Sequence, residues 1–306
     1  MNKQHLISSY AIPDVLAIDE TEHGLIRATV STTACTAEIY LQGAHLAQWQ
    51  PKGSKPVLFL SERSDFLPGK AIRGGVPIIF PWFGSRTATP YSPRTDGPSH
   101  GFARTSNWQL ASATINGDDL NLTLTLDPNE TSRSLGYDDF RLTYKLTIGA
   151  ELALQLTVEN SSKAPMLFEE ALHSYFMVGD VQQTTISGLC NTEYFDKTDG
   201  FKRKRQEESI LRLTGETDRP YIDTEAQIFL EDPIFKRRMT VDKLNSKTTV
   251  VWNPWSEVTA KLADMSSDGW RRMVCVETAN AGENAVTLAA GEQHTMHARI
   301  AVKDSE

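Results

Sequence analysis

Regular alternation of apolar and polar residues is the feature of this 306-residue chain that most restricts its fold. A period of two residues is typical of antiparallel strands that bury one face. Three consecutive segments show it, with apolar side chains at Leu120, Leu122, Leu124 and Leu126, at Leu142, Tyr144, Leu146 and Ile148, and at Leu152, Leu154, Leu156 and Val158. The pattern therefore predicts half-buried strands in an antiparallel sheet.

The second and third of these segments also predict how they pair with each other. If their even-numbered residues share one face, Ile148 must lie opposite Leu152. The loop between them then has an odd number of residues, and the simplest solution is residues 149–151. A two-residue loop would divide the apolar side chains between the two faces of the sheet.

Shorter apolar segments predict further strands along the rest of the chain, and glycine and proline separate most of them. These segments are 24–30, 37–42, 57–60, 227–230, 248–252 and 295–302. No long segment has the 3.6-residue period of an amphipathic helix, so any helices are expected to be few and short. No shift in composition marks a domain boundary. We therefore predict an all-β chain whose residues 1–306 form a single domain, a large antiparallel β-sandwich.

Composition excludes several classes of partner. A net charge of −8 argues against nucleic acid, because domains that bind it are usually basic. No stretch approaches the roughly 18 apolar residues that cross a bilayer, and residues 1–9 are too polar for the core of a signal peptide. Cys35, Cys190 and Cys275 lack paired spacing, which is typical of reduced thiols. We expect a cytoplasmic protein with no membrane and no nucleic-acid partner.

Two ionisable side chains stand inside apolar, strand-like segments about a hundred residues apart. His173 lies in FEEALHSYF and Glu277 in MVCVET. Desolvating an unpaired ionisable group costs several kcal/mol, so such a residue usually has a partner or a function. Alternation places His173 on one face with Tyr175, and Glu277 on one face with Cys275. An imidazole and a carboxylate are suited to moving protons on a sugar.

Structural interpretations of the same two residues are also open. His173 could be a core histidine whose ring nitrogens bond to the backbone, to Glu169 or to Glu170, and Glu277 could reach solvent at a strand end. A helical interpretation would instead give Glu170 and His173 the spacing of a carboxylate-bridged metal site. The chain has no second copy of that pair, no HExxH motif and no clustered cysteines, so we predict no metal.

Arginine, glycine and histidine recur in two neighbouring motifs. Arg73 precedes a glycine pair in IRGGVPIIFPWFG, and SHGFAR contains His100 and Arg104. Glycine allows close approach of the backbone to a ligand, and a guanidinium donates to oxyanions in a fixed fork. Each motif could also be a tight turn with an exposed arginine. Asp196 and Asn253 are weaker candidates, since turn chemistry explains both.

Residues 83–99 join these two motifs and are predicted to form an irregular loop. Proline, serine, threonine and glycine dominate this segment, and none of its residues continues an alternating pattern. Long irregular loops inside compact domains are often binding loops or mobile lids. We therefore expect residues 85–98 to influence which ligand is accepted.

Taken in order, six motifs resemble the aldose 1-epimerase superfamily: IRGGVPIIFPWFG, SHGFAR, EEALHSYFMVGD, YFDK, VVWNPW and VCVETA. They look most like its hexose-6-phosphate mutarotase branch, the glucose-6-phosphate 1-epimerases. The resemblance covers most of the chain, from about residue 41 to beyond residue 279. It implies a β-sandwich of the galactose mutarotase type, a monomer without metal or organic cofactor, and a sugar phosphate as small-molecule partner.

The resemblance also implies roles for individual residues. His173 matches the general acid of the family, and Glu277 matches its general base. Arg73, Arg104 and Asp196 match substrate-binding positions of the family. His100 matches a histidine that lines the sugar site. Some members carry glutamine just before the His-Gly pair, where this chain has Ser99.

The expected reaction is interconversion of the α and β anomers of aldohexose 6-phosphates. Glu277 would take the proton of the anomeric hydroxyl while His173 protonates the ring oxygen, from opposite sides of a pyranose-sized pocket. The alternatives are a mutarotase of unphosphorylated aldoses, a non-catalytic carbohydrate-binding protein, and a glycoside hydrolase or lyase that pairs Glu277 with a second carboxylate. Anomer exchange distinguishes the binding protein from the mutarotases, and release of reducing sugar identifies the hydrolase.

Overall fold

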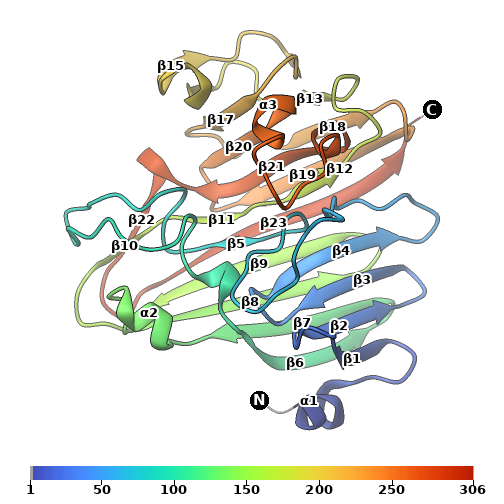
Figure 1. Cartoon of the computed structure of the whole chain (residues 1–306), viewed down its shortest axis with the longest axis vertical. Coiled ribbons are helices and arrows are strands. Elements are labelled where there is room, and N and C mark those ends of the chain that lie inside the picture. The colour runs from blue at the N-terminus through green and yellow to red at the C-terminus, as the bar shows by residue number, and fades with distance from the viewer. Residues whose placement is uncertain (1–2, 306) are drawn as a thin grey trace.

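The computed structural model describes residues 3–305, and strands are its main secondary structure (Figure 1). Within these residues the ladders between named strands are all antiparallel. The fold is the antiparallel β-sandwich that the alternation predicts. The helices are short: α1 (Lys3–Tyr10), α2 (Glu130–Ser134), α3 (Trp255–Thr259), and the 3-10 helices η1 (Ala103–Thr105), η2 (Lys197–Asp199), η3 (Gly269–Arg272) and η4 (Gly282–Asn284).

The largest sheet has nine strands and contains all three alternating segments. Ile148 lies opposite Leu152 in this sheet, which confirms the predicted register and the loop at residues 149–151. From edge to edge the strands are β16 (Ile210–Arg212), β13 (Thr185–Ser187), β18 (Ile228–Asp232), β19 (Arg237–Leu244), β23 (Gln293–Asp304), β9 (Leu152–Asn160), β8 (Phe140–Ile148), β7 (Asp119–Leu126) and β6 (Gln109–Asn116).

An eight-stranded sheet contains Glu277 and the two strands that flank His173. Its strands are, in order, β15 (Lys202–Arg205), β14 (Glu193–Asp196), β17 (Thr217–Tyr221), β20 (Thr248–Asn253), β21 (Met273–Asn280), β11 (Glu170–Leu172) and β5 (Ile78–Ile79), with β12 (Tyr175–Met177) also paired to β21. Two smaller sheets complete the fold: β1 (Leu16–Glu20), β2 (Ile26–Ser31), β3 (Cys35–Tyr40) and β4 (His45–Pro51), and the pair β10 (Met166–Phe168) and β22 (Val286–Leu288).

The main core packs the nine-stranded sheet against the other sheets. The even-numbered apolar residues of β7, β8 and β9 belong to the same buried cluster as Trp49 of β4 and Val274 and Val276 of β21. Burying one such side chain stabilises the fold by about 1.5–3 kcal/mol. Trp49 also donates its indole hydrogen to the Gly149 carbonyl at 3.1 Å. Because Val274 and Val276 fill the core, the odd-numbered residues of β21 face the opposite side of their sheet.

One predicted strand is not formed as such. Residues 57–60 make only isolated bridges, between Leu58 and Phe176 and between Leu60 and Gly74. The segment divides its backbone hydrogen bonds between two neighbours: the Phe59 amide donates to the Tyr175 carbonyl of β12 at 2.9 Å, and the Phe59 carbonyl accepts from the Gly75 amide at 2.7 Å. Neither neighbour forms a continuous ladder with it. The other five predicted segments overlap β2, β3, β18, β20 and β23. None of the helices within residues 3–305 could span a bilayer, and α1, the longest α-helix, has eight residues.

A buried ion pair on the core side links β11 to β23. Glu170 is fully buried, and its Oε1 lies 3.0 Å from His294 Nε2. Asn280 donates to the same oxygen at 2.9 Å. Burial alone would lower the pKa of His294, but the hydrogen bond and negative charge of Glu170 outweigh it, so the pKa is raised above its ordinary value of 6.5.

This pair predicts a pH-dependent contribution to stability. Because the pKa of His294 is raised on folding, the stabilisation is fully present below the unfolded-state pKa of about 6.5 and is lost as pH rises through the folded-state pKa. We expect His294→Gln to lower the denaturation midpoint more at about pH 6 than at about pH 9. Urea denaturation at both pH values measures this difference. His297→Gln, on the same strand but the other face, is the control. If His294→Gln lowers the midpoint equally at both pH values, the assignment is wrong.

Candidate active site

Strand register brings His173 and Glu277 together. β11 ends opposite Thr278 of β21, and β12 begins opposite Cys275 of the same strand. His173, which lies between β11 and β12, therefore falls opposite Glu277, with its Nε2 3.5 Å from Glu277 Oε1. The expectation that the two groups lie on opposite sides of a pyranose-sized pocket is wrong, because they are in direct contact.

Both side chains are buried, and each keeps a polar atom without a partner. His173 is 6% exposed and Glu277 is 1% exposed. The imidazole stacks on Tyr175, with ring centroids 4.8 Å apart, and meets the edge of Trp252 at 6.1 Å. Within the described residues, His173 Nδ1 and Glu277 Oε2 have no hydrogen-bond partner. Buried polar groups are rarely left unpaired, so these two atoms require an explanation.

The structural alternatives for His173 do not hold. Glu170 pairs with His294 on the other face of the sheet. Glu169 accepts the backbone amides of Phe83 and Gly282, each at 2.7 Å. Neither carboxylate is bonded to His173, and this segment is extended, so the helical metal-site spacing is not formed either. Asn253, in contrast, has the turn role that the sequence suggests, since its Oδ1 accepts the Trp255 amide at 2.8 Å.

Burial shifts the pKa values of the pair in opposite directions. It lowers the pKa of His173 well below its ordinary value, and the positive charges of neighbouring groups, including Arg104 and Arg73, lower it further. It raises the pKa of Glu277 well above its ordinary value, helped by the negative charge of Asp218. Each shift favours the neutral form of its group, so burial favours an uncharged imidazole beside a carboxyl group that is harder to ionise.

Lys197 and Asp218 belong to this cluster, although neither stands out in the sequence. Lys197 Nζ lies 3.1 Å from Asp218 Oδ1 and 5.0 Å from the centre of the Phe83 ring. Burial raises the pKa of the Asp218 carboxyl, while Lys197 partly offsets the effect. Their charges also act on Glu277, which Asp218 makes harder to ionise and Lys197 makes easier. Lys197 and Asp218 thus supply a polar wall beside the pair.

Asp196, a candidate from the sequence, is not brought into the cluster. Tyr194 of β14 pairs with Tyr221 of β17, so these two side chains lie on the same face of the sheet. Asp196 is two residues after Tyr194 and therefore lies on that face too. Asp218, three residues from Tyr221, faces the other way, which is the side of Glu277. The Asp196 carboxylate is already bonded: Lys204 Nζ donates at 2.8 Å, and the Thr198 amide and hydroxyl donate at 3.1 and 2.6 Å.

Arg73 lies beside the pair but is partly occupied. Its Nε donates to Asp264 Oδ2 at 3.0 Å, and its Nη1 donates to the Tyr175 hydroxyl at 3.2 Å. Tyr175 in turn stacks on His173, so Arg73 is connected to the imidazole through one ring. This arrangement fixes the position of Arg73 and leaves only part of its donor fork for a ligand.

Arg104 is oriented differently. Its Nη2 donates to the Ser99 carbonyl at 2.8 Å, and within residues 3–305 no carboxylate lies at ion-pair distance from it. Its charge nevertheless acts on His173. Arg104 is therefore a guanidinium beside the site that forms no ion pair with any described carboxylate, and this favours an anionic ligand.

His100 forms a third side of the site. Its ring lies 5.6 Å from that of His173 and 4.8 Å from that of Phe83. Burial lowers its pKa to about 3, so the ring is neutral. The Gly84 amide donates to its Nδ1 at 3.2 Å, which places the ring proton on Nε2. His100 can therefore donate one hydrogen bond to a ligand oxygen.

A cleft of about 700 Å³ opens beside this cluster. Phe83 and Lys197 line both the cleft and the surroundings of the pair, and Phe195, Phe201 and Pro220 provide apolar walls. The volume is within the range of small-molecule sites, about 300–1,000 Å³. The cluster therefore lies next to a space large enough for a phosphorylated sugar.

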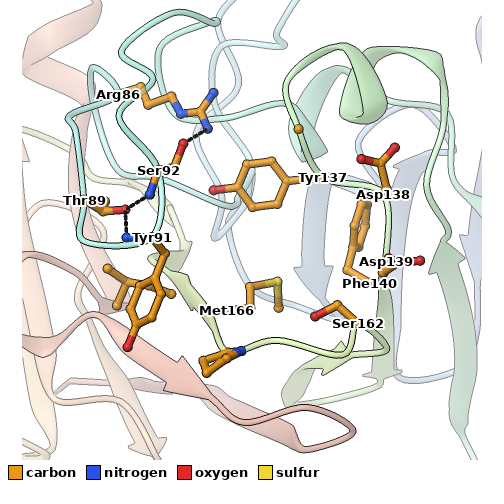
Figure 2. Close-up of a pocket in the computed structure, with 13 residues that line it drawn as sticks. Arg86, Thr89, Tyr91, Ser92, Tyr137, Asp138, Asp139, Phe140, Ser162 and Met166 are labelled. Atoms are coloured by element: carbon orange, nitrogen blue, oxygen red, sulfur yellow. Dashed lines mark hydrogen bonds between the residues drawn. The ribbon is translucent and has the colours of Figure 1, made fainter.

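Residues 85–98 are irregular, as predicted, but they are anchored. Arg86 is only 7% exposed, and its guanidinium lies 4.7 Å from the Trp82 ring and 5.5 Å from the Tyr137 ring. It donates to the Leu135 carbonyl at 3.1 Å and to the Ser92 hydroxyl at 3.3 Å. Figure 2 shows Arg86 and Ser92 at one side of a pocket of about 240 Å³ with Tyr137 beside them, and Asp138 and Phe140 at the other side. Arg86 thus ties the loop to the sandwich.

The comparisons with known proteins agree with this geometry. A family model described as aldose 1-epimerase matches residues 27–301. A protein of Escherichia coli strain K12, provisionally named a glucose-6-phosphate 1-epimerase, is 34% identical over 247 residues, which cover 81% of this chain and 80% of that protein. A protein of Cenchrus ciliaris with the same provisional name is 30% identical over 85% of this chain and 79% of its own.

Solved structures show the same fold. The crystal structure of a provisionally assigned mutarotase from Salmonella typhimurium has a TM-score of 0.88 and 30% identity, and covers 98% of this chain and 99% of that one. A galactose mutarotase-like protein from Clostridium acetobutylicum, 14% identical, has a TM-score of 0.72 over 96% of this chain and 100% of its own, which shows the fold alone. From the family model and the curated relatives together, this chain belongs to the aldose 1-epimerase family.

Proposed function

We propose that the protein is a glucose-6-phosphate 1-epimerase, which interconverts the α and β anomers of aldohexose 6-phosphates. The observation that carries the proposal is the buried contact between His173 and Glu277 beside Arg73 and Arg104. Membership of the aldose 1-epimerase family supports the reaction, and the provisional names of the relatives support the phosphorylated substrate.

The short separation of the pair suits this reaction. In a pyranose the anomeric oxygen O1 and the ring oxygen O5 are both bonded to C1. An acid and a base that act on these two oxygens must therefore lie close together, at one edge of the ring. The 3.5 Å contact between His173 Nε2 and Glu277 Oε1 meets that requirement. Groups on opposite sides of the ring would not.

In the proposed reaction, Glu277 takes the proton from the O1 hydroxyl while His173 gives a proton to O5. The C1–O5 bond breaks, and C1 becomes the carbon of an aldehyde. Rotation about C1–C2 presents its other face to the O5 hydroxyl. Ring closure then returns the O5 proton to His173 and the Glu277 proton to O1. The two roles reverse between opening and closing, so each group gives a proton in one step and takes it back in the other.

The substrate's phosphate would also change the pKa of His173. The positive charges of Arg73 and Arg104 contribute to the lowered pKa of His173. A phosphate dianion beside these arginines would offset their charge and raise the pKa of the imidazole towards its ordinary value. Binding of a phosphorylated sugar would then favour the protonated imidazole that donates to O5.

We expect Arg104 to bind the phosphate group of the substrate. Arg104→Ala should lower kcat/KM for glucose 6-phosphate by about 10–100-fold, since a hydrogen bond to a charged group contributes about 1.5–3 kcal/mol. Exchange of unphosphorylated glucose should change little. Anomer-exchange NMR on both sugars measures the two rates. Arg63→Ala, at an exposed arginine, is the matched control.

The same measurements separate the other functions. Equal losses on both sugars would mean that Arg104 holds the sugar ring or the fold and not the phosphate. A wild-type protein that exchanges glucose as fast as glucose 6-phosphate would be a mutarotase of unphosphorylated aldoses. Exchange of both sugars at their background rates would leave a non-catalytic carbohydrate-binding protein.

We also propose that the enzyme acts as a monomer in the cytoplasm. The thiols of Cys35, Cys190 and Cys275 are all free, which suits a reducing compartment. Light scattering of the purified protein tests the monomer, and fractionation of cells tests the location.

A further inference from the structure

A third side chain adjoins the acid–base pair. Cys275 is two residues before Glu277 on β21 and therefore points to the same face. It is fully buried, between Tyr175 of β12 and Trp252 of β20. One ligand-type atom of each residue, in His173, Cys275 and Glu277, lies within 4.8 Å of the other two.

These three atoms are the ligand types that zinc binds in proteins: an imidazole nitrogen, a cysteine sulfur and a carboxylate oxygen. With metal–ligand distances of about 2.0–2.3 Å, neighbouring ligands of a tetrahedral zinc ion are about 3.3–3.8 Å apart. The 3.5 Å between His173 Nε2 and Glu277 Oε1 is already within that range. The sulfur of Cys275, within 4.8 Å of both, needs a shift of about 1 Å at most.

An unsatisfied polar atom supports a ligand at this position. Glu277 Oε2 is buried and has no partner among residues 3–305. A cation between the three side chains would offset the cost of burying the carboxylate.

We propose that His173, Cys275 and Glu277 form a binding site for zinc, or for another thiophilic divalent cation, that switches the enzyme off. On binding, the Cys275 thiol loses its proton to water and its sulfur bonds to the metal, with no change of oxidation state. The metal also takes the Nε2 lone pair of His173 and an oxygen of Glu277. Neither group can then carry a proton to or from a sugar. The inhibition rests on the proposed function, whereas the metal binding does not.

Cobalt(II) is the probe that tests binding independently of activity. We expect chelator-treated wild-type protein to show, on addition of CoCl2, a thiolate-to-cobalt charge-transfer band and the intense visible bands of four-coordinate Co²⁺. Cys275→Ser should lose the thiolate band. Cys190→Ser, at the exposed cysteine, should retain it and is the matched control. Circular dichroism verifies that each variant is folded, and Cys275→Ala is the second variant if the serine is not tolerated.

Zinc inhibition of anomer exchange is the second measurement. We expect ZnCl2 to inhibit the wild type reversibly, with activity restored by a chelator. Cys275→Ser should raise the half-inhibitory zinc concentration by about 10-fold or more, because even changes around metal ligands cost about 10–100-fold in affinity. Cys190→Ser should behave like the wild type.

Three outcomes would overturn the site: no thiolate band in the wild type, a band that persists without Cys275, or a band that depends on Cys190. Inhibition that is equal in the wild type and in Cys275→Ser would overturn the switch. If the wild type catalyses no anomer exchange at all, the proposed function fails, and the cobalt spectra still decide the metal site.

Discussion

His173→Asn and Glu277→Gln are each expected to lower kcat of anomer exchange on glucose 6-phosphate by about 10²–10⁴-fold, the usual contribution of a positioned acid or base. Both substitutions keep the approximate size of the side chain and remove its ability to transfer a proton. KM should change less, because Arg73 and Arg104 would still hold the substrate. Exchange NMR, corrected for the spontaneous rate, measures the effect.

The double variant provides a sharper test of the assignment. If the acid and the base act in one proton relay, removing both should cost little more than removing one. Glu257→Gln is the control, since Glu257 is exposed and does not line the neighbouring cleft. Catalysed rates within a few-fold of wild type in either single variant would show that the pair does not perform the chemistry.

Gly101→Ala is expected to lower the free energy of unfolding by about 2–5 kcal/mol, from overpacking together with left-handed backbone strain. Gly101 has a φ of +70°, and a Cβ at this position would be forced against the Phe80 carbonyl. The glycine lies between His100 and Arg104 in the SHGFAR motif. Its close approach to Phe80 holds this motif, with both its site residues, against the sandwich.

Gly117→Ala is the matched control for that experiment. Gly117 has a φ of +62°, and a Cβ added there meets no described atom within 4 Å. The Gly117→Ala variant should therefore show only the left-handed backbone strain, about 1–2 kcal/mol. Urea denaturation of both variants separates the two effects. Equal losses would mean that the contact with Phe80 relaxes at no cost.

The alternation of apolar and polar residues predicted much of the fold, because the direction of each side chain on a strand depends on short-range geometry. The period of two residues in β8 and β9 fixed which residues face the core, and this in turn required Ile148 opposite Leu152. The same alternation placed Glu277 on one face with Cys275. Where a segment pairs irregularly, as at residues 57–60, alternation alone could not show that no regular ladder forms.

The site depends on pairing between distant strands, which the sequence does not encode locally. The motifs named His173 and Glu277, but their direct contact follows from the pairing of β11 and β12 with β21. Asp196 and Asp218 both stand near strand ends in polar sequence. Only the register of β14 with β17 shows that Asp218 faces Glu277 and Asp196 does not.

Glu277 lies on β21 and His173 lies between the two strands that pair with it, whereas Arg104 lies in the short 3-10 helix η1 and His100 in the turn before that helix. Mutation can therefore reshape sugar recognition without altering the spacing that the chemistry requires. Lineages of this enzyme should diverge first in the aldoses that they accept, and only rarely in the reaction that they catalyse.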